Sequence, residues 1–130
     1  WDSVMIGSDS SLRSLEGVLN YGKPHPRGYG TFSRVIRKYV NETSILSIEE
    51  AIYKMTGFPA QTLGLKDRGI LKEGFFADIT IFDQETIAEQ ATFTSPHNYS
   101  TGIKHVLVNG KLTINDGKHE SVTNGAILKK

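Results

Sequence analysis

The hydrophobic period of this chain changes part-way along its length, and this change limits the folds open to it. From position 31 onward, apolar side chains recur every three or four residues, at Phe32, Val35, Ile36, Tyr39 and Val40. That spacing places them on one face of an α-helix. Residues 77–83 instead alternate apolar and polar side chains, which is typical of a strand with one buried face. We therefore predict an α+β fold, with a helical part over residues 1–66 and a β part over residues 67–130.

Local signals predict the ends of two further helices. Ser47 and Glu50 have the spacing of a capping box, in which each side chain bonds the backbone N–H of the other. A helix is therefore expected over residues 48–55. A shorter helix is expected over residues 60–63, because Gly64 follows it and glycine commonly ends helices.

Turn signals divide the β part into short strands. An Asn-Gly dipeptide at residues 109–110 is typical of a type I′ hairpin, so residues 104–108 and 111–114 are expected to pair antiparallel. A second turn is expected at residues 115–117. Residues 126–128 are expected to form a last short strand.

Asp9 is the first candidate for chemistry, and it follows a short apolar run at residues 4–6. Gly7 closes this run, so we expect a strand that ends in a loop. In an α/β barrel all strands point toward one mouth, where catalytic carboxylates lie, and Asp9 has the position of a general base there. The alternative is an aspartate that turns its loop through its own backbone bonds.

His25 and Arg27 lie in a loop that glycines and prolines punctuate over residues 10–30, with one helical turn expected at residues 12–19. Loops of this length are usually functional, and the prolines restrict the backbone beside both side chains. Arg27 is suited to binding a carboxylate with both arms of its guanidinium. The alternative is a solvated arginine with a packed histidine.

Composition and charge exclude several classes of function. Fifteen basic and fourteen acidic residues give a net charge of +1, so no nucleic-acid partner is expected. The chain has no apolar run near the roughly 18 residues of a membrane span, so we expect no membrane partner and a cytoplasmic location. It has no cysteine and its four histidines are far apart in sequence, so no metal site is expected within it.

Short motifs also follow one another in a distinctive order. The early motifs are Met5-Ile6-Gly7-Ser8-Asp9, Pro24-His25-Pro26-Arg27 and Tyr29-Gly30-Thr31-Phe32. The later motifs include Leu46-Ser47-Ile48-Glu49-Glu50, Asp67-Arg68-Gly69, Ala77-Asp78-Ile79 and Val106-Leu107-Val108-Asn109-Gly110. Together they resemble the carboxyl-terminal part of D-aminoacylases, the N-acyl-D-amino-acid deacylases of the metal-dependent amidohydrolase superfamily. The chain begins with a tryptophan, and we interpret it as a carboxyl-terminal piece of a longer protein.

This resemblance implies a fold and a division of labour. The family folds as a metal-bearing (β/α)₈ barrel with a small β-sandwich domain. Residues 1–66 would supply the last barrel strand and the closing helices, and residues 67–130 would supply the carboxyl-terminal part of the sandwich.

The resemblance also implies an activity on a small-molecule N-acyl-D-amino acid. The family cleaves its amide with a zinc-bound water, and Asp9 would move the proton of this water to the leaving amine. Arg27 would pair with the substrate's α-carboxylate, while His25 would shape the binding loop. The zinc ligands belong to sequence upstream of Trp1, so the isolated chain is expected to hold no zinc and to be inactive.

Two alternatives stay open at this point. One is another amidohydrolase, such as a hydantoinase-like or dihydroorotase-like cyclic amidase. The other is a non-catalytic β module that serves as an interaction domain. Open strand edges also predict self-association of the chain.

Overall fold

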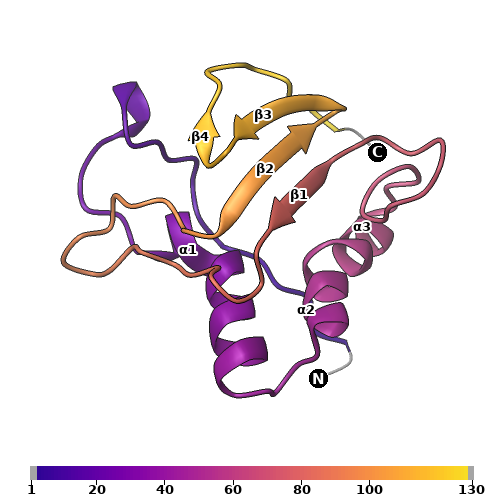
Figure 1. Ribbon diagram of the computed structural model, residues 1–130. Coiled ribbons are helices and arrows are strands. Elements are labelled where there is room, and N and C mark those ends of the chain that lie inside the picture. The colour runs from indigo at the N-terminus through magenta and orange to yellow at the C-terminus, as the bar shows by residue number, and fades with distance from the viewer. Residues whose placement is uncertain (1–2, 129–130) are drawn as a thin grey trace.

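A computed structural model describes residues 3–128 of the chain as helices followed by a small antiparallel sheet (Figure 1). The helical elements are η1 (Gly17–Leu19, a 3₁₀ turn), α1 (Arg27–Arg34), η2 (Val35–Glu42, a π-helix), α2 (Ile48–Met55) and α3 (Gly57–Leu63). The strands are β1 (Ile79–Phe82), β2 (Ile103–Val108), β3 (Lys111–Asn115) and β4 (Lys118–His119). The predicted α+β class is confirmed. The outermost residues of the two predicted parts, 1–2 and 129–130, lie outside the described residues.

Helix α1 begins at Arg27, so the loop predicted over residues 10–30 ends earlier than expected. Glycine is unfavourable inside helices, and this made the segment resemble a loop. The structure shows why a glycine is needed there: Gly30 is buried, and a β-carbon on it would lie 2.6 Å from the β-carbon of Glu89. The close approach of a distant segment therefore requires glycine here and outweighs helix propensity. The helical turn expected at residues 12–19 is present as the shorter η1.

The helix that starts at Arg27 continues as the π-helix η2, whose wider turns bring residues five positions apart onto one face. Arg37 and Glu42 have this spacing and form an ion pair. The apolar face predicted from residue 31 onward is largely confirmed, because its buried members are Val35, Ile36 and Val40.

The next two helices follow their predicted signals closely. The Ser47 hydroxyl accepts a hydrogen bond from the Glu50 N–H at 3.1 Å, and the Glu50 carboxylate accepts one from the Ser47 N–H at 2.8 Å. The capping box therefore starts α2 as predicted. Helix α3 begins earlier than expected but ends at Gly64, whose φ of 73° is left-handed.

The four strands form one antiparallel meander in chain order, with β1 and β4 at its edges (Figure 1). Both predicted hairpins are confirmed. Asn109 and Gly110 have φ angles of 50° and 77°, and Asp116 and Gly117 have 46° and 75°. Two consecutive left-handed residues are what a type I′ turn requires, and its twist matches that of the strands.

Two predicted strands are not formed. Residues 4–6 have no regular structure, and the Ile6 N–H donates to the Lys54 carbonyl of α2 at 3.0 Å. A strand needs another strand to satisfy its backbone groups, and within residues 3–128 this segment meets a helix instead. Residues 126–128 are also irregular, because the chain after β4 is held by side-chain bonds such as Asn109 Nδ2 to the Asn124 carbonyl (2.6 Å).

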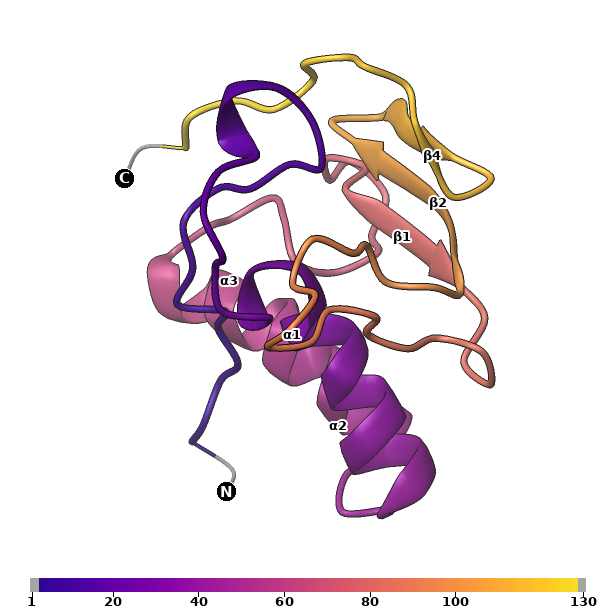
Figure 2. The same ribbon diagram turned by 90° about the vertical axis from the view of Figure 1, so that its left-hand side faces the viewer.

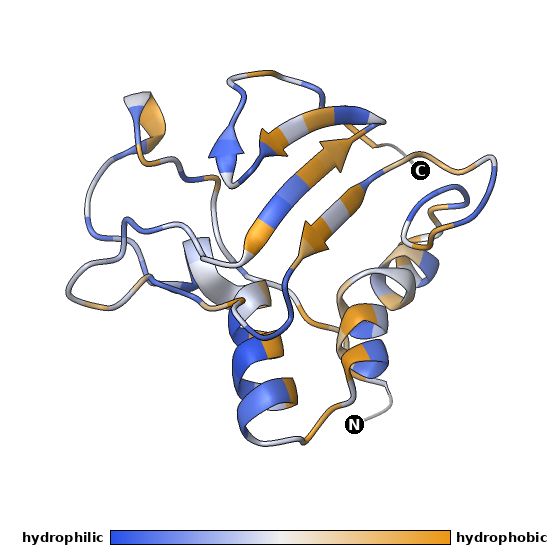
Figure 3. Cartoon of the chain, viewed as in Figure 1, coloured by the Kyte–Doolittle hydropathy of each residue, from blue (hydrophilic) through white to orange (hydrophobic). Residues whose placement is uncertain are grey.

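The core lies between the helices. Val35, Val40 and Ala51 are buried together, and Ile6 and Leu46 are among the partly buried residues packed against them. Figure 3 shows apolar residues on the sides of η2 and α2 that face each other. This packing joins the start of the chain to the helices that follow it.

The long connection between β1 and β2 turns back to the helical part, as Figure 2 shows beside α1. Ile87 and Ala91 on this connection are buried, and the segment makes hydrogen bonds to α1 and to the loop before it. The helical and β parts are therefore tied together far from the point where they join in sequence.

Candidate active site

The structure brings together two of the three predicted site residues. Arg27 is the first residue of α1, and its Nη2 lies 3.2 Å from Oδ2 of Asp9. The Asp9 side chain is 90% exposed and that of Arg27 is 46% exposed. A carboxylate and a guanidinium are thus paired at the surface, both within reach of a small molecule.

Asp9 has an unusual backbone conformation for a residue other than glycine. Its φ of 47° lies in the left-handed region, which aspartate tolerates better than most residues. The conformation places the carboxylate against Arg27. Strained backbone often accompanies functional sites, and the left-handed conformation of Asp9 is consistent with such a role.

His25 has a local partner at the start of α1. Its Nδ1 accepts a hydrogen bond from the Arg27 N–H at 3.1 Å, and its ring packs edge-on against Phe93 with centroids 4.9 Å apart. The bond satisfies one of the unpaired N–H groups at a helix start. The histidine therefore contacts the backbone of Arg27 and the connection between β1 and β2.

A cavity of about 170 Å³ lies beside Arg27. Ser8, Thr31 and Phe32 line it, together with Ser100 from the connection between β1 and β2. Hydroxyl groups and an aromatic ring therefore adjoin the guanidinium.

The carboxylate of Glu89 binds two arginines of the helical segment that begins at Arg27, Arg34 in α1 and Arg37 in η2. Glu89 accepts hydrogen bonds at 2.7 Å from Nη1 of Arg34 and from Nε of Arg37, and its side chain is only 10% exposed. The hydrogen bonds from Arg37 are the main cause that lowers the pKa of Glu89 to about 2, against the opposing effect of burial. The same contacts raise the pKa of Arg37. The sequence analysis missed Glu89, because its partners lie more than fifty positions away.

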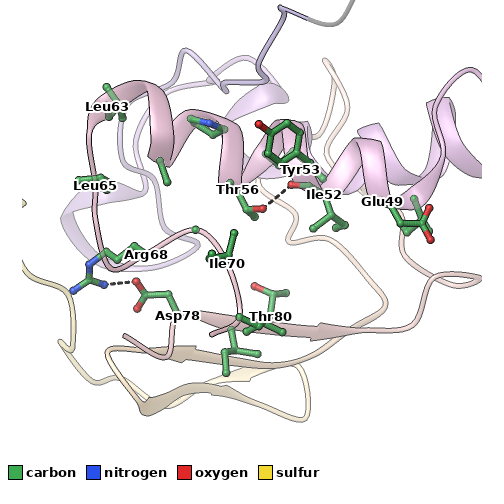
Figure 4. Close-up of a pocket in the computed structure, with 18 of the residues that line it drawn as sticks. Glu49, Ile52, Tyr53, Thr56, Leu63, Leu65, Arg68, Ile70, Asp78 and Thr80 are labelled. Carbon is green, nitrogen blue, oxygen red and sulfur yellow. Dashed lines mark hydrogen bonds and ion pairs between the residues drawn. The ribbon is translucent and has the colours of Figure 1, made fainter. Parts of the chain in front are cut away.

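A larger hollow lies elsewhere, between α2, α3 and β1. It has a volume of about 870 Å³ and a mostly apolar lining that includes Ile52, Leu63 and Ile70 (Figure 4). Arg68 and Asp78 form an ion pair on its wall, drawn as a dashed line in Figure 4. None of the three predicted site residues lines this groove, so its size does not make it the site of chemistry.

Residues 3–128, which the structure describes, do not form a zinc site. Within the part of the chain that the structure describes, no three histidine, aspartate or glutamate side chains come together as ligands would. Asp9 is a single carboxylate whose partner is Arg27. No helix in the same residues is long and apolar enough to cross a membrane.

Comparison with known proteins places the chain in a family. A model of the amidohydrolase family matches residues 3–114. The chain belongs to the amidohydrolase family. It is 46% identical over 109 residues to N-acyl-D-glutamate deacylase of Alcaligenes xylosoxydans xylosoxydans, which covers 84% of this chain and 21% of that protein.

Solved structures of amidohydrolases agree with this assignment. A crystal structure of D-aminoacylase superposes with a TM-score of 0.86 at 37% identity, covering 97% of this chain and 25% of that one. N-acyl-D-glutamate deacylase from Bordetella bronchiseptica, complexed with zinc and a phosphonate inhibitor, superposes with a TM-score of 0.75 at 38% identity, covering 93% and 25%. The chain therefore spans about a fifth to a quarter of the length of these relatives, and the resemblance to D-aminoacylases predicted from its motifs is confirmed.

Proposed function

We propose that this chain is part of a zinc-dependent hydrolase that converts N-acyl-D-amino acids to a carboxylate and a D-amino acid. The observation that carries the proposal is the contact between Asp9 and Arg27, a proton acceptor beside a carboxylate-binding group. The relatives named above are deacylases of D-amino acids, and they match the chain over most of its length.

Arg27 would bind the α-carboxylate of the substrate. In the structure its guanidinium already pairs with a carboxylate, that of Asp9, and about half of the side chain stays open to solvent. A substrate carboxylate would take the place of this contact and would leave Asp9 free to move a proton. Arginine suits the task because its planar fork offers parallel N–H donors to both carboxylate oxygens.

Asp9 would act as general base and then as general acid. The oxygen of the attacking water forms a bond to the acyl carbon while Asp9 accepts the proton that the water loses. The C–N bond then breaks as Asp9 returns the proton to the leaving nitrogen, which departs as the amine of the D-amino acid. The exposure of Asp9 allows this, because its carboxylate is not enclosed by the described part of the chain.

His25 belongs to the binding site in this proposal through Arg27. Its bond to the Arg27 N–H and its contact with Phe93 hold the first turn of α1 in place. The histidine therefore shapes the loop that meets the substrate's carboxylate.

The fold assignment belongs to the same proposal. Residues 1–66 would supply the last strand and the closing helices of a (β/α)₈ barrel. Residues 67–130 would contribute strands to a small β-sandwich domain. Bound zinc would polarise the acyl group. Its ligands would come from other parts of the intact protein, so the 130-residue chain alone would be inactive, and we expect the intact enzyme in the cytoplasm.

Hydrolysis by the full-length protein with zinc tests the proposal. We expect release of the D-amino acid from N-acetyl-D-amino acids and little from the L-enantiomers, measured by chiral chromatography. Hydrolysis of a cyclic amide with no activity on any N-acyl-D-amino acid would favour the cyclic amidase instead. The similarity to a dihydroorotase of Endomicrobium trichonymphae favours that alternative. The two sequences are 41% identical over 58 residues, which cover 45% of the chain.

A role as a non-catalytic interaction module rests on the edges of the sheet. β1 is an edge strand, and Ile81 on it is 47% exposed. Open edges of this kind favour self-association of the chain. Gel filtration of the 130-residue chain tests this: an oligomer supports self-association, and a compact monomer contradicts it.

A further inference from the structure

The 88–101 loop, part of the connection between β1 and β2, packs against the start of α1. It is the β part of the chain that supplies this loop, yet its contacts lie in the helical part (Figures 1 and 2). Ala91 and Pro96 are buried, so the loop is anchored rather than free in solution.

Tyr29 is the centre of these contacts, only two residues beyond Arg27. Its hydroxyl carries one hydrogen, which faces two acceptors, the Ser14 carbonyl at 2.8 Å and Nδ1 of His97 at 3.1 Å. The ring of Tyr99 lies 5.8 Å from that of Tyr29. Partial burial and Tyr99 raise the pKa of Tyr29 above its ordinary value.

His97 connects Tyr29 to the segment that precedes α1. Its Nε2 lies 2.8 Å from the Gly22 carbonyl, and a carbonyl oxygen can only accept, so Nε2 carries a hydrogen. Its Nδ1 contacts the Tyr29 hydroxyl. One imidazole therefore bonds both to the loop before Arg27 and to the helix that starts with it.

Neighbouring residues of the 88–101 loop reinforce this connection. Ser100 Oγ donates to the Tyr29 carbonyl at 3.2 Å and lies 2.5 Å from the hydroxyl of the buried Ser33. The Tyr99 hydroxyl accepts from the Leu15 N–H at 3.3 Å. The backbone on both sides of Arg27 is thus held by side chains from one distant loop.

We propose that His97, through Tyr29, is a positioning residue that places the Arg27 guanidinium for the substrate's carboxylate. The proposal rests on the proposed function, because Arg27 is the group that meets the carboxylate there. His97 does not touch the reacting atoms. Its effect is to hold the first turn of α1 at one distance from residues 14–22.

Amide hydrogen exchange on the 130-residue chain tests the positioning without any activity. In His97→Ala, we expect exchange of the amides of residues 28–31 to rise about three- to tenfold, the loss that follows from one net hydrogen bond. His97→Gln should stay within about twofold of the parent chain, because its amide nitrogen can still donate to Gly22. His119→Ala removes an exposed histidine on β4 and should leave these amides unchanged.

Steady-state kinetics of the full-length zinc enzyme test the consequence for substrate. His97→Ala should raise the KM for N-acetyl-D-amino acids about three- to tenfold with kcat nearly unchanged, and His97→Gln should restore it. The KM for the corresponding amino-acid amides, which lack the carboxylate, should not change. Tyr29→Phe should resemble His97→Ala, whereas Tyr39→Phe, outside this network, should resemble the parent.

Two results would overturn the positioning role. One is unchanged amide exchange at residues 28–31 in His97→Ala. The other is an equal rise in KM for the acids and their amides, which would indicate general damage to the fold. Absence of deacylase activity in the parent enzyme would instead contradict the proposed function, and the exchange experiment would still decide whether His97 holds α1.

Discussion

Asp9 and Arg27 form one ion pair, but the segments that carry them are built differently. Asp9 lies on residues 3–26, where most side chains are exposed and the only regular element is the short η1. Arg27 begins α1, which continues into η2; Glu89 binds Arg37 of η2, and Ser100 binds the Tyr29 carbonyl of α1. One partner is carried by a weakly packed segment and the other by an anchored helix.

Because of this difference, substitutions in the two segments should affect activity and stability to different extents. A change at Asp9 removes a functional group and little packing, so it should leave the fold intact. A change at Glu89 breaks buried contacts with Arg34 and Arg37 and should mainly lower the free energy of unfolding.

Asp9→Asn should lower kcat of the full-length enzyme about 10³-fold or more, because an amide cannot accept and return the proton. The midpoint of thermal unfolding should not change, since the side chain is exposed and asparagine also tolerates a left-handed backbone. Asp116→Asn is the matched control, because Asp116 has a similar φ of 46° in a distant turn. If Asp9→Asn kept the activity of the parent enzyme, Asp9 would not be the general base.

Arg27→Ala should raise KM for N-acetyl-D-amino acids about 10- to 100-fold, the loss expected for a charge-assisted pair, with a smaller effect on kcat. Arg27→Lys keeps the positive charge but lacks the planar guanidinium, so its KM should lie between those of the parent and of Arg27→Ala. Initial rates over a range of substrate concentrations measure both. Equal KM values for all three proteins would show that the carboxylate binds elsewhere.

Glu89→Gln should lower the free energy of unfolding of the 130-residue chain by about 3 kcal/mol at pH 7. The pKa of Glu89 falls from 4.5 to about 2 on folding, so its contribution is complete above about pH 4.5 and is lost as pH falls toward 2. Urea unfolding at pH 7 and pH 3 measures it. The difference between the parent and Glu89→Gln should shrink at low pH.

Glu85→Gln is the control for this experiment, because Glu85 is an exposed carboxylate on the same connection. It should leave stability and its pH dependence unchanged. A Glu89→Gln protein as stable as the parent would show that the anchored helix does not depend on this contact.

Ser47→Ala should cost about 1 kcal/mol, the usual contribution of an N-cap, without affecting activity. The double variant Ser47→Ala/Glu50→Ala should lose less than the sum of the single variants, because the two side chains act as one capping box. Chemical denaturation of the four proteins measures this. Full additivity would indicate that the two bonds contribute independently to α2.

Local signals predicted the elements that depend on local chemistry. The capping box at Ser47 and the two hairpin turns have their bonds or dihedral angles within a few residues, so the sequence was enough. The predicted loop at the start of α1 and the predicted strand at residues 4–6 were wrong, because both segments depend on residues far away in sequence. The glycine at position 30 is required by the close approach of the distant Glu89, and a strand depends on a neighbour to pair with.

By itself the sequence determined the α+β class, the family resemblance and the choice of Asp9 and Arg27 as site residues. The contact between these two side chains, and the network of Glu89 and His97 behind it, were decided only by the tertiary structure. These contacts join residues far apart in the chain, and no local pattern of hydrophobicity or turn residues specifies such a pairing. Long-range packing is therefore what brings the two candidate residues together.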